Sequence, residues 1–409
     1  MNRVIIVGNG FDLAHGLKTK YSDFIDWYWD QWVNVLWNVT SNVASDPLCT
    51  FKANGTDPWS LHIYTLRRSF NQFSGRELLE RVKSFPDSYS IQKSLLLERI
   101  SNSIYELNWV DIENEYYKIL KDYSKQRSDL GLIVQLNNQL NFIQNILIKY
   151  LRSANCVDHT PSVIIGHKML SPFSENEIAV SRLYELRQYI IDGYHNQEAM
   201  KKRACRYQIP SDKFTLDNAD FYIQYQDKDI ESVALNLFPD IFKRPDRILL
   251  LNFNYTHVAD MSLPVADEFE INHIHGDISF PKTVIFGYGD ELDHEYSDIL
   301  SRNENCYLDN IKSIRYLESS NYRRMLQFIE SAPFQVYIMG HSCGNSDRTL
   351  LNTIFEHDNC VSVKPFYYVK EDGSDNYLEL VQNISRNFTD MKKMRDRVVN
   401  KEFCEPLVK

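Results

Sequence analysis

Apolar positions form short runs towards both ends of the chain and a helical pattern between them. The run Val4–Val7 is followed at once by Gly8-Asn9-Gly10, and a buried strand that leads into glycines is typical of the first unit of a parallel α/β sheet. From Tyr21 to about Val39 the apolar spacing becomes helical and rich in tryptophan. The sequence therefore predicts a strand, a turn and a helix at its start.

The stretch between about residues 60 and 240 is predicted to be mainly helical. Ile91–Leu107 and Ile112–Tyr123 are long mixtures of polar and apolar residues, and Leu132–Leu151 carries apolar residues at helical spacing. Residues 153–180 hold Pro, Gly and Ser, so we predict a loop there.

Strand-like patterns return after Pro245. Short apolar runs predict strands at Arg247–Phe253, Asn272–His275, Thr283–Phe286, Phe334–Met339 and Val361–Val369. From Tyr377 onwards the spacing is that of an amphipathic helix, which we expect to dock on the core.

One strand before the helical stretch and about five after it form a single sheet only if the helical stretch is an insertion. We therefore predict an α/β fold, a Rossmann-like parallel sheet interrupted by a large helical insertion. The expected domains are a core of residues 1–60 and 245–372, an insertion of residues 61–244, and a C-terminal helix within residues 373–409.

Composition narrows the class of protein. The 409 residues include 45 Lys and Arg against 55 Asp and Glu, and this net charge of −10 argues against nonspecific binding of nucleic acid. The seven cysteines form no CxxC pair, so neither a zinc ribbon nor a disulfide framework is expected. The first apolar run is too short for a signal peptide, and no run has the roughly 18 apolar residues of a membrane span. We expect a cytoplasmic protein without a membrane partner, and a homo-oligomer stays open.

The first candidate for chemistry is the segment Gly8-Asn9-Gly10. Glycines after a strand let the backbone approach a phosphate, and the helix that follows offers free N–H groups. The third glycine of a dinucleotide fingerprint is replaced by Leu13. Asp12 would repel a phosphate, but it could cap the helix or bond a ribose hydroxyl. The alternative is a tight turn that binds nothing.

Two further candidates follow predicted strands. In Asn252-Phe253-Asn254-Tyr255-Thr256, Asn and Thr side chains could hold ribose hydroxyls or a water, and the alternative is an Asx turn. In His273-Ile274-His275-Gly276, a histidine at a strand end suits a general base. A structural histidine is the alternative, and a metal site of His273 and His275 lacks a third ligand with convincing spacing.

The last candidates are a glycine-rich loop and an acidic pair. Gly340-His341-Ser342-Cys343 continues to Asp347 after a strand, and a nucleophilic Cys343 is a weaker alternative there because no feature indicates a lowered thiol pKa. Asp111 and Glu113 could present carboxylates to the cleft from the insertion. Alternatively, Asn108 with Asp111 starts a helix.

Taken together, these segments resemble the bacteriophage abortive-infection AbiH family. The resemblance frames nearly the whole chain and is carried by residues 5–24, 108–113, 251–256, 273–276, 285–290 and 340–347. The usual family form of the last segment has Leu where this chain has Cys343. The resemblance implies a role in phage defence, with a phage-derived trigger or a partner defence protein.

The chain also resembles, more distantly, sirtuin-type NAD-binding domains. Gly8 and Gly10 match their first glycine segment, Asn252 to Thr256 matches Thr-Gln-Asn-Ile-Asp, and His275-Gly276 matches their His-Gly pair. This likeness places a ribose-side Asn on Asn254 and the catalytic base on His275. Because the CxxC pairs of the sirtuin zinc module are missing, it implies consumption of NAD rather than deacylation, with no zinc.

These resemblances imply hydrolysis of NAD to nicotinamide and ADP-ribose. His275 would be the base and Asn254 would orient the attacking water or the ribose. The expected cofactor-binding residues are Gly8, Asn9, Gly10, Phe11, Asp12, His15, Asn252, Thr256, Gly276, Gly340, His341, Ser342 and Asp347. Two alternatives are a non-catalytic sensor of NAD or ADP-ribose, and a metal-dependent nuclease that uses Asp111 and Glu113.

Overall fold

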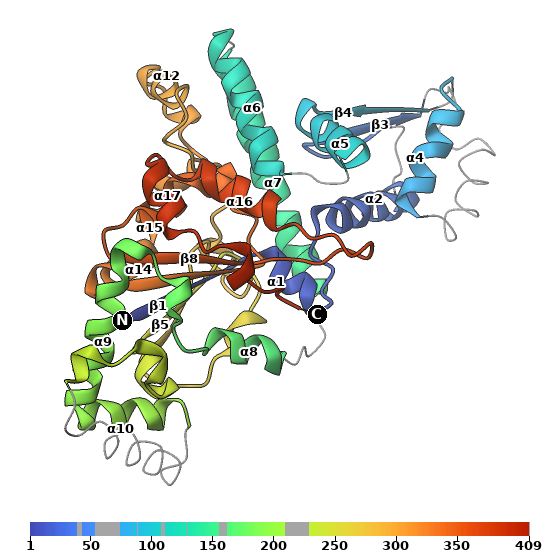
Figure 1. Ribbon diagram of the computed structural model, residues 1–409. Helices are drawn as coiled ribbons and strands as arrows, with labels where there is room; N and C mark the ends of the chain where they lie inside the picture. The colour runs from blue at the N-terminus through green and yellow to red at the C-terminus, as the bar shows by residue number, and fades with distance from the viewer. Residues whose placement is uncertain are drawn as a thin grey trace. The chain divides into compact units, whose positions relative to one another are not determined.

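The computed structural model describes residues 1–38, 43–53, 74–87, 89–107, 111–127, 129–154, 162–208 and 229–408 (Figure 1). The chain divides into two compact units. The sheet unit comprises Met1–Leu17, Asp158–Ile285 and Ser313–Lys409, and the helical unit comprises Lys18–Val157 and Phe286–Lys312. Within the described ranges, no helix has both the length and the apolar character that crossing a membrane requires.

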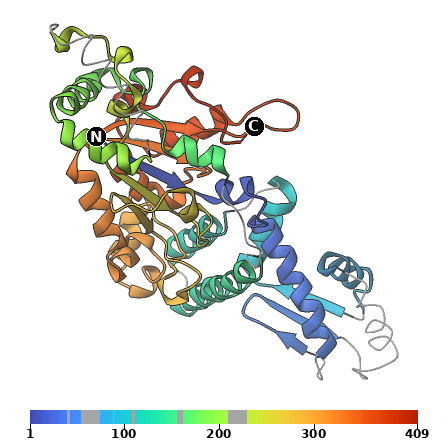
Figure 2. The same ribbon diagram turned by 90° about the horizontal axis from the view of Figure 1, so that it is seen from below.

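The sheet unit is built on five parallel strands (Figure 2). They are β1 (Asn2–Val7), β5 (Ile248–Asn252), β6 (Phe269–His273), β7 (Phe334–Met339) and β8 (Cys360–Phe366), and they lie in the order β6-β5-β1-β7-β8. This confirms the predicted parallel sheet with the N-terminal strand inside it. Strand order reverses next to β1, so the loops that follow β1 and β7 meet at the switch point, where open α/β sheets bind ligands.

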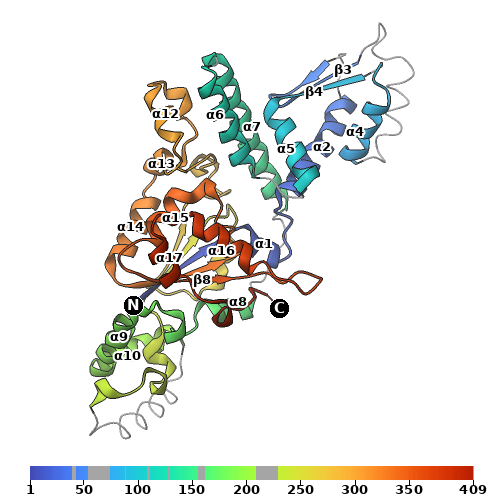
Figure 3. The ribbon, with the colours of Figure 1, turned by 45° about the horizontal axis from the view of Figure 1, so that its top comes forward.

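Helices cover both faces of this sheet, which explains why four of its strands, β1, β5, β7 and β8, are buried along their whole length. The helices of the sheet unit are α1 (Asn9–Ala14), α8 (Val163–Met169), α9 (Leu183–His195), α10 (Gln197–Arg206), α14 (Asn321–Ser331), α15 (Arg348–Phe355), α16 (Tyr377–Arg386) and α17 (Met391–Arg397), and α13 (Lys312–Arg315) begins at the boundary. Val4 packs with α14, α15 and α16, whereas Ile5 packs with α1 and α8. A third apolar cluster joins Met1 to α9 and α10, which lie side by side in Figure 3.

The helical unit combines helices with a small antiparallel sheet. Its elements are α2 (Tyr21–Asn38), β2 (Val43–Ser45), β3 (Cys49–Ala53), α4 (Gly75–Ser84), β4 (Tyr89–Lys93), α5 (Leu95–Leu107), α6 (Ile112–Lys125), α7 (Leu130–Ala154) and α12 (Tyr296–Ser301). The strands pair in the order β2-β3-β4. The predicted helices at Tyr21, Ile112 and Leu132 are confirmed, whereas the three strands were not predicted.

Three local predictions were wrong. Ile91 lies in β4, and the helix expected from it begins only at Leu95. The loop expected at 153–180 contains α8, and residues 155–161 lie outside the described residues. In the fully described stretch 229–408, Thr283–Phe286 lies outside any strand. Its apolar residues Val284, Ile285 and Phe286 are buried, and Ile285 N–H donates to the His275 carbonyl (2.9 Å) in a loop.

The compact units also differ from the expected domain boundaries. Residues 18–60 fall in the helical unit and 158–244 in the sheet unit. The second difference has a packing cause, because Ile165 of α8 is buried against the sheet and Phe173 is buried beside Met1. At the C-terminal end, α16 buries Leu380 and Ile384 on the sheet, as expected of the predicted amphipathic helix. Leu378, in the first turn of the same helix, is instead 66% exposed.

Candidate functional site

Four loops at the carboxyl ends of β1, β5, β6 and β7 carry most of the predicted site residues. All of these loops belong to the sheet unit. Asp111 and Glu113 belong to the helical unit. The sheet unit therefore brings together every predicted residue except this acidic pair.

Glycines pack the β1 loop directly on the β7 loop. Gly10 N–H donates to the Gly340 carbonyl oxygen (2.7 Å). A Cβ built on Gly8 would lie 2.5 Å from the His341 Cα, and one on Gly340 would lie 2.1 Å from the Phe11 nitrogen. Gly340 also has a φ of +76°, which strongly favours glycine. These glycines allow close contact between loops, and the contact engages the Gly10 N–H that a phosphate would need.

We predict that Gly340→Ala lowers the free energy of unfolding by about 2–4 kcal/mol, because left-handed strain adds to a backbone collision. Urea unfolding of the full chain measures this change. Gly373→Ala is the matched control, since its φ is +81° and its Cβ would meet no described atom within 4 Å. The control should lose only about 1 kcal/mol. Equal losses in the two variants would contradict the collision.

Asp12 joins the β1 loop to the β5 loop. Its Oδ1 accepts a hydrogen bond from Asn254 Nδ2 (3.0 Å), and its Oδ2 accepts one from Thr256 Oγ1 (2.6 Å). Asn254 Nδ2 also donates to the Gly8 carbonyl oxygen (3.0 Å). Burial raises the pKa of the Asp12 carboxyl to about 6, although both hydrogen bonds lower it. Asn254, the predicted ribose or water ligand, is therefore held by an acidic side chain.

The raised pKa of Asp12 makes stability fall as pH rises. Between the ordinary pKa of 3.8 and about 6 the folded chain binds more protons than the unfolded chain, so stability is lost across that window. The contribution is about 3 kcal/mol. We predict that Asp12→Asn, which carries no charge, loses about 2 kcal/mol less than the unmodified protein between pH 4 and pH 7. Parallel pH profiles of unfolding free energy would contradict this.

His275 lies in a buried group with a tyrosine and a carboxylate. Its Nε2 is 3.0 Å from the Tyr316 hydroxyl and 3.2 Å from Asp347 Oδ1. Asp347 Oδ2 lies 3.6 Å from His341 Nε2, so one carboxylate stands between two histidines. The Phe253 ring packs edge-on against both imidazoles. The sequence predicted His275, His341 and Asp347 but not Tyr316, which is 41 positions from its partner.

Hydrogen bonds determine which ring nitrogen of His341 and of His15 carries the proton in the neutral side chain. His341 Nδ1 accepts the Cys343 N–H (3.0 Å), so neutral His341 carries its proton on Nε2. His15 Nδ1 lies 2.8 Å from the Phe11 carbonyl oxygen, and its Nε2 accepts the Ser162 N–H (3.1 Å). Both His15 nitrogens are therefore engaged by the backbone, and one face of its ring is stacked on Phe11.

Other predicted residues of the glycine-rich loops differ in exposure. Phe11 is fully buried, whereas the Asn9 and Ser342 residues are exposed. Cys343 is also fully buried, and burial raises the pKa of its thiol well above the ordinary value. A buried thiol with a raised pKa is a poor nucleophile, so the weaker alternative of a cysteine nucleophile finds no support.

His273 and His275 point into different groups, so they do not form the two-histidine site considered from the sequence. His273 Nε2 lies 2.8 Å from Asp260 Oδ2. Gly276 makes the turn after His275 with a φ of +75°, and a Cβ there would lie 2.1 Å from the Thr283 carbonyl oxygen. Asn252, buried at the end of β5, donates to Asp260 Oδ1 (3.3 Å). Sequence reasoning missed Asp260, which lies beyond the Asn252–Thr256 motif and contacts both His257 and His273.

The acidic pair has structural partners in the helical unit. Asp111 caps α6 by accepting the Asn114 N–H (3.0 Å), and Asn108 lies outside the described residues. Glu113 Oε1 accepts the Gly287 N–H (3.0 Å) and pairs with Lys312 Nζ (3.0 Å). Glu113 thus connects two segments, 108–113 and 285–290, that were singled out in the sequence.

Comparison with known proteins identifies the family. No curated protein and no solved structure matches the chain. One family model, described as Bacteriophage abortive infection AbiH, matches residues 4–369, which include all the loops and both acidic residues described above. The chain therefore belongs to the bacteriophage abortive infection AbiH family.

Proposed function

We propose that this member of an abortive-infection family binds NAD at the carboxyl edge of a Rossmann-like, sirtuin-like sheet and hydrolyses it to nicotinamide and ADP-ribose. The observation that carries the proposal is the buried pair of His275 Nε2 and Asp347 Oδ1, 3.2 Å apart. Strand order supports the location, since the loops after β1 and β7 meet beside β1.

In the proposed reaction the bond between C1′ of the ribose and the nicotinamide nitrogen breaks, and its electron pair neutralises the pyridinium ring. Water forms the new bond to C1′ and gives its proton to His275 Nε2 after that nitrogen is released from its contacts with Tyr316 and Asp347. The Asp347 carboxylate stabilises the resulting imidazolium, because an opposite charge nearby favours the charged form. Asn254 orients the water or the ribose through an amide that Asp12 already holds.

The glycine-rich loops supply the remaining contacts of the proposed complex. Gly8, Asn9, Gly10 and Phe11 surround the pyrophosphate and nicotinamide side, whereas Gly340, His341, Ser342 and Asp347 line the adenosine side. Because Gly10 N–H is engaged by Gly340 in the free protein, a phosphate would have to displace that contact or use other groups of the loop.

The second candidate is a sensor that binds NAD or ADP-ribose without cleaving it. It is favoured by the engagement of His275 Nε2 with both Tyr316 and Asp347, since an engaged nitrogen accepts no further proton until it is released. Either proposal includes a location in the cytoplasm and activation by a phage-derived trigger or a partner defence protein.

Incubation of the purified full chain with NAD, followed by chromatography, tests the proposal. We expect nicotinamide and ADP-ribose to appear in equal amounts. Calorimetric titration with NAD is the companion measurement, because saturable binding without products would support the sensor. If the chain neither binds NAD nor forms products, whether phage protein is absent or present, both candidates are contradicted.

A further inference from the structure

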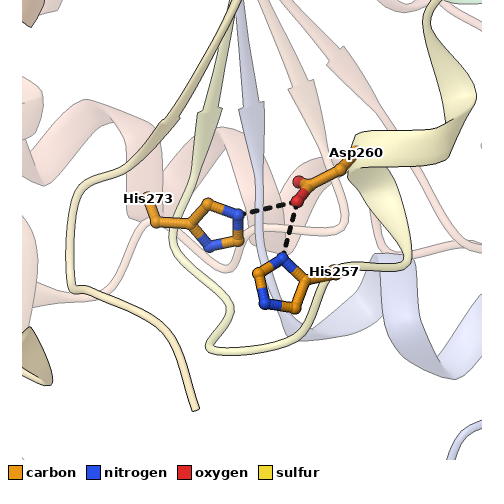
Figure 4. A group of neighbouring side chains, drawn as sticks. All are labelled: His257, Asp260 and His273. Carbon is orange, nitrogen blue, oxygen red and sulfur yellow. Dashed lines mark hydrogen bonds and ion pairs between the residues drawn. The ribbon is translucent and has the colours of Figure 1, made fainter. Parts of the chain in front are cut away.

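A second group of side chains lies at the outer edge of the same sheet. His257 and Asp260 follow β5, and His273 ends the neighbouring strand β6 (Figure 4). Asp260 Oδ2 lies 2.8 Å from His257 Nδ1 and 2.8 Å from His273 Nε2. Two imidazoles therefore converge on one carboxylate oxygen.

We propose that His257, Asp260 and His273 bind a divalent transition-metal ion of the zinc class. Imidazole nitrogen and carboxylate oxygen are ligands that such ions prefer, whereas magnesium and calcium favour sets of oxygen ligands. The three potential ligand atoms lie within 4.8 Å of one another. Tetrahedral metal bonds of about 2.1 Å hold ligand atoms about 3.4 Å apart, so the two 2.8 Å contacts would open by about 0.6 Å and the widest separation would close by about 1.4 Å at most.

The surroundings of these residues match the outer contacts of metal sites, in which a bound histidine directs its other nitrogen to a carboxylate or hydroxyl. His257 Nε2 lies 3.1 Å from Ser279 Oγ and 3.4 Å from Asp277 Oδ1. Asp260 Oδ1, the oxygen turned away from the histidines, accepts from Asn252 Nδ2 (3.3 Å). These contacts orient two of the three ligands.

Two proton-bearing nitrogens crowd one oxygen of this cluster. A carboxylate only accepts hydrogen bonds, so both histidines must direct N–H groups at the same oxygen. His273 Nδ1 is buried without a hydrogen-bond partner among the described residues, and an ion bound at Nε2 would leave it so. An ion would take the two converging nitrogens, and neutral His257 would keep its proton on Nε2, which faces Asp277.

The site is accessible from solvent. The exposed fractions of the side chains are 46% for His257, 19% for Asp260 and 12% for His273. Three protein ligands on an open surface leave coordination positions for water, as in catalytic zinc sites. The site is separate from the proposed hydrolysis, which uses His275 and no metal.

Calorimetric titration of the chelator-treated full chain with zinc chloride tests this site. We expect one zinc ion per chain and no heat of binding from magnesium chloride. Asp260→Asn and His273→Asn should each abolish the binding. Asp277→Asn, which keeps all three ligands, should weaken it by about 10- to 100-fold. His294→Asn is the control, since this exposed histidine lies in the helical unit.

The absence of zinc binding in the unmodified chain would overturn the proposal, and so would undiminished binding in Asp260→Asn and His273→Asn. Circular dichroism of each variant separates loss of a ligand from loss of folding. If a ligand variant unfolds, the Asp277→Asn result decides, because unchanged affinity there would also overturn the proposal. The titration contains no NAD, so its outcome is independent of the hydrolysis assay.

Discussion

Replacing His275 with alanine is expected to reduce nicotinamide release from NAD by about 100- to 10,000-fold, the usual contribution of a general base. His275 is the buried histidine whose Nε2 stands beside both a carboxylate and a tyrosine hydroxyl. Chromatographic assay of product at saturating NAD measures the change in kcat. Binding of NAD should persist, because the contacts proposed for the β1 loop and for Gly340–Ser342 do not use the His275 imidazole.

The conservative variant His275→Gln separates chemistry from folding. Glutamine can still bond the Tyr316 hydroxyl, but it cannot take up a proton at neutral pH. It should therefore be as inactive as alanine while unfolding at the same temperature as the unmodified chain. His195→Ala, an exposed histidine at the end of α9, should keep full activity. Release of nicotinamide by His275→Gln at an unchanged rate would remove His275 from the mechanism.

Glu113→Gln is expected to lower the free energy of unfolding by about 3–5 kcal/mol, the usual cost of breaking a buried ion pair. The side chain of its partner Lys312 is only 1% exposed, so the ammonium would remain in a buried position beside a neutral amide. Glutamine preserves the acceptor for the Gly287 N–H, so the loss reports the charge. Urea unfolding of the full chain gives the value.

Two further variants define the origin of that loss. Glu113→Gln combined with Lys312→Met should recover most of it, because replacing both members of a buried pair with uncharged groups is often neutral. Glu80→Gln, from an exposed pair with Lys83, should cost less than about 1 kcal/mol.

The Glu113 variants also test the alternative that the chain is a metal-dependent nuclease. A metal-dependent activity that is lost in Glu113→Gln and returns in the double variant depends on folding rather than on a catalytic carboxylate.

Most of the sheet was predictable because the strands β1, β5, β7 and β8 are buried and carry apolar runs, whereas the edge strand β6 is partly exposed. Phe334–Met339 was predicted with its observed bounds, and Val4–Val7 lies within β1. The antiparallel strand β4 was missed because it is short and leads into α5 almost at once. At Thr283–Phe286 a strand was predicted where none exists, because apolar residues buried in a loop give the same sequence pattern as a strand buried in a sheet.

The candidate site was predictable where a motif followed a strand directly. Asn254, His275 and His341 each stand just beyond a strand, and parallel strands bring such positions to one edge. Tyr316 was missed because its partner His275 is distant in sequence. A usable signal existed for Asp260, which stands three residues after His257 in the same loop and one strand away from His273.

The position of β1 inside the sheet has a consequence for how the chain is made. Its neighbours are β5 and β7, and β7 ends at Met339. About 330 residues must therefore be synthesised after β1 before both of its edges are paired, which takes roughly 15–70 s at usual rates of translation. Throughout that time the Gly8–Gly10 turn lacks the Gly340 loop on which it packs. A ribosome-bound chain that stops before this point carries an incomplete site, so the proposed hydrolysis of NAD would begin only after synthesis has passed Met339.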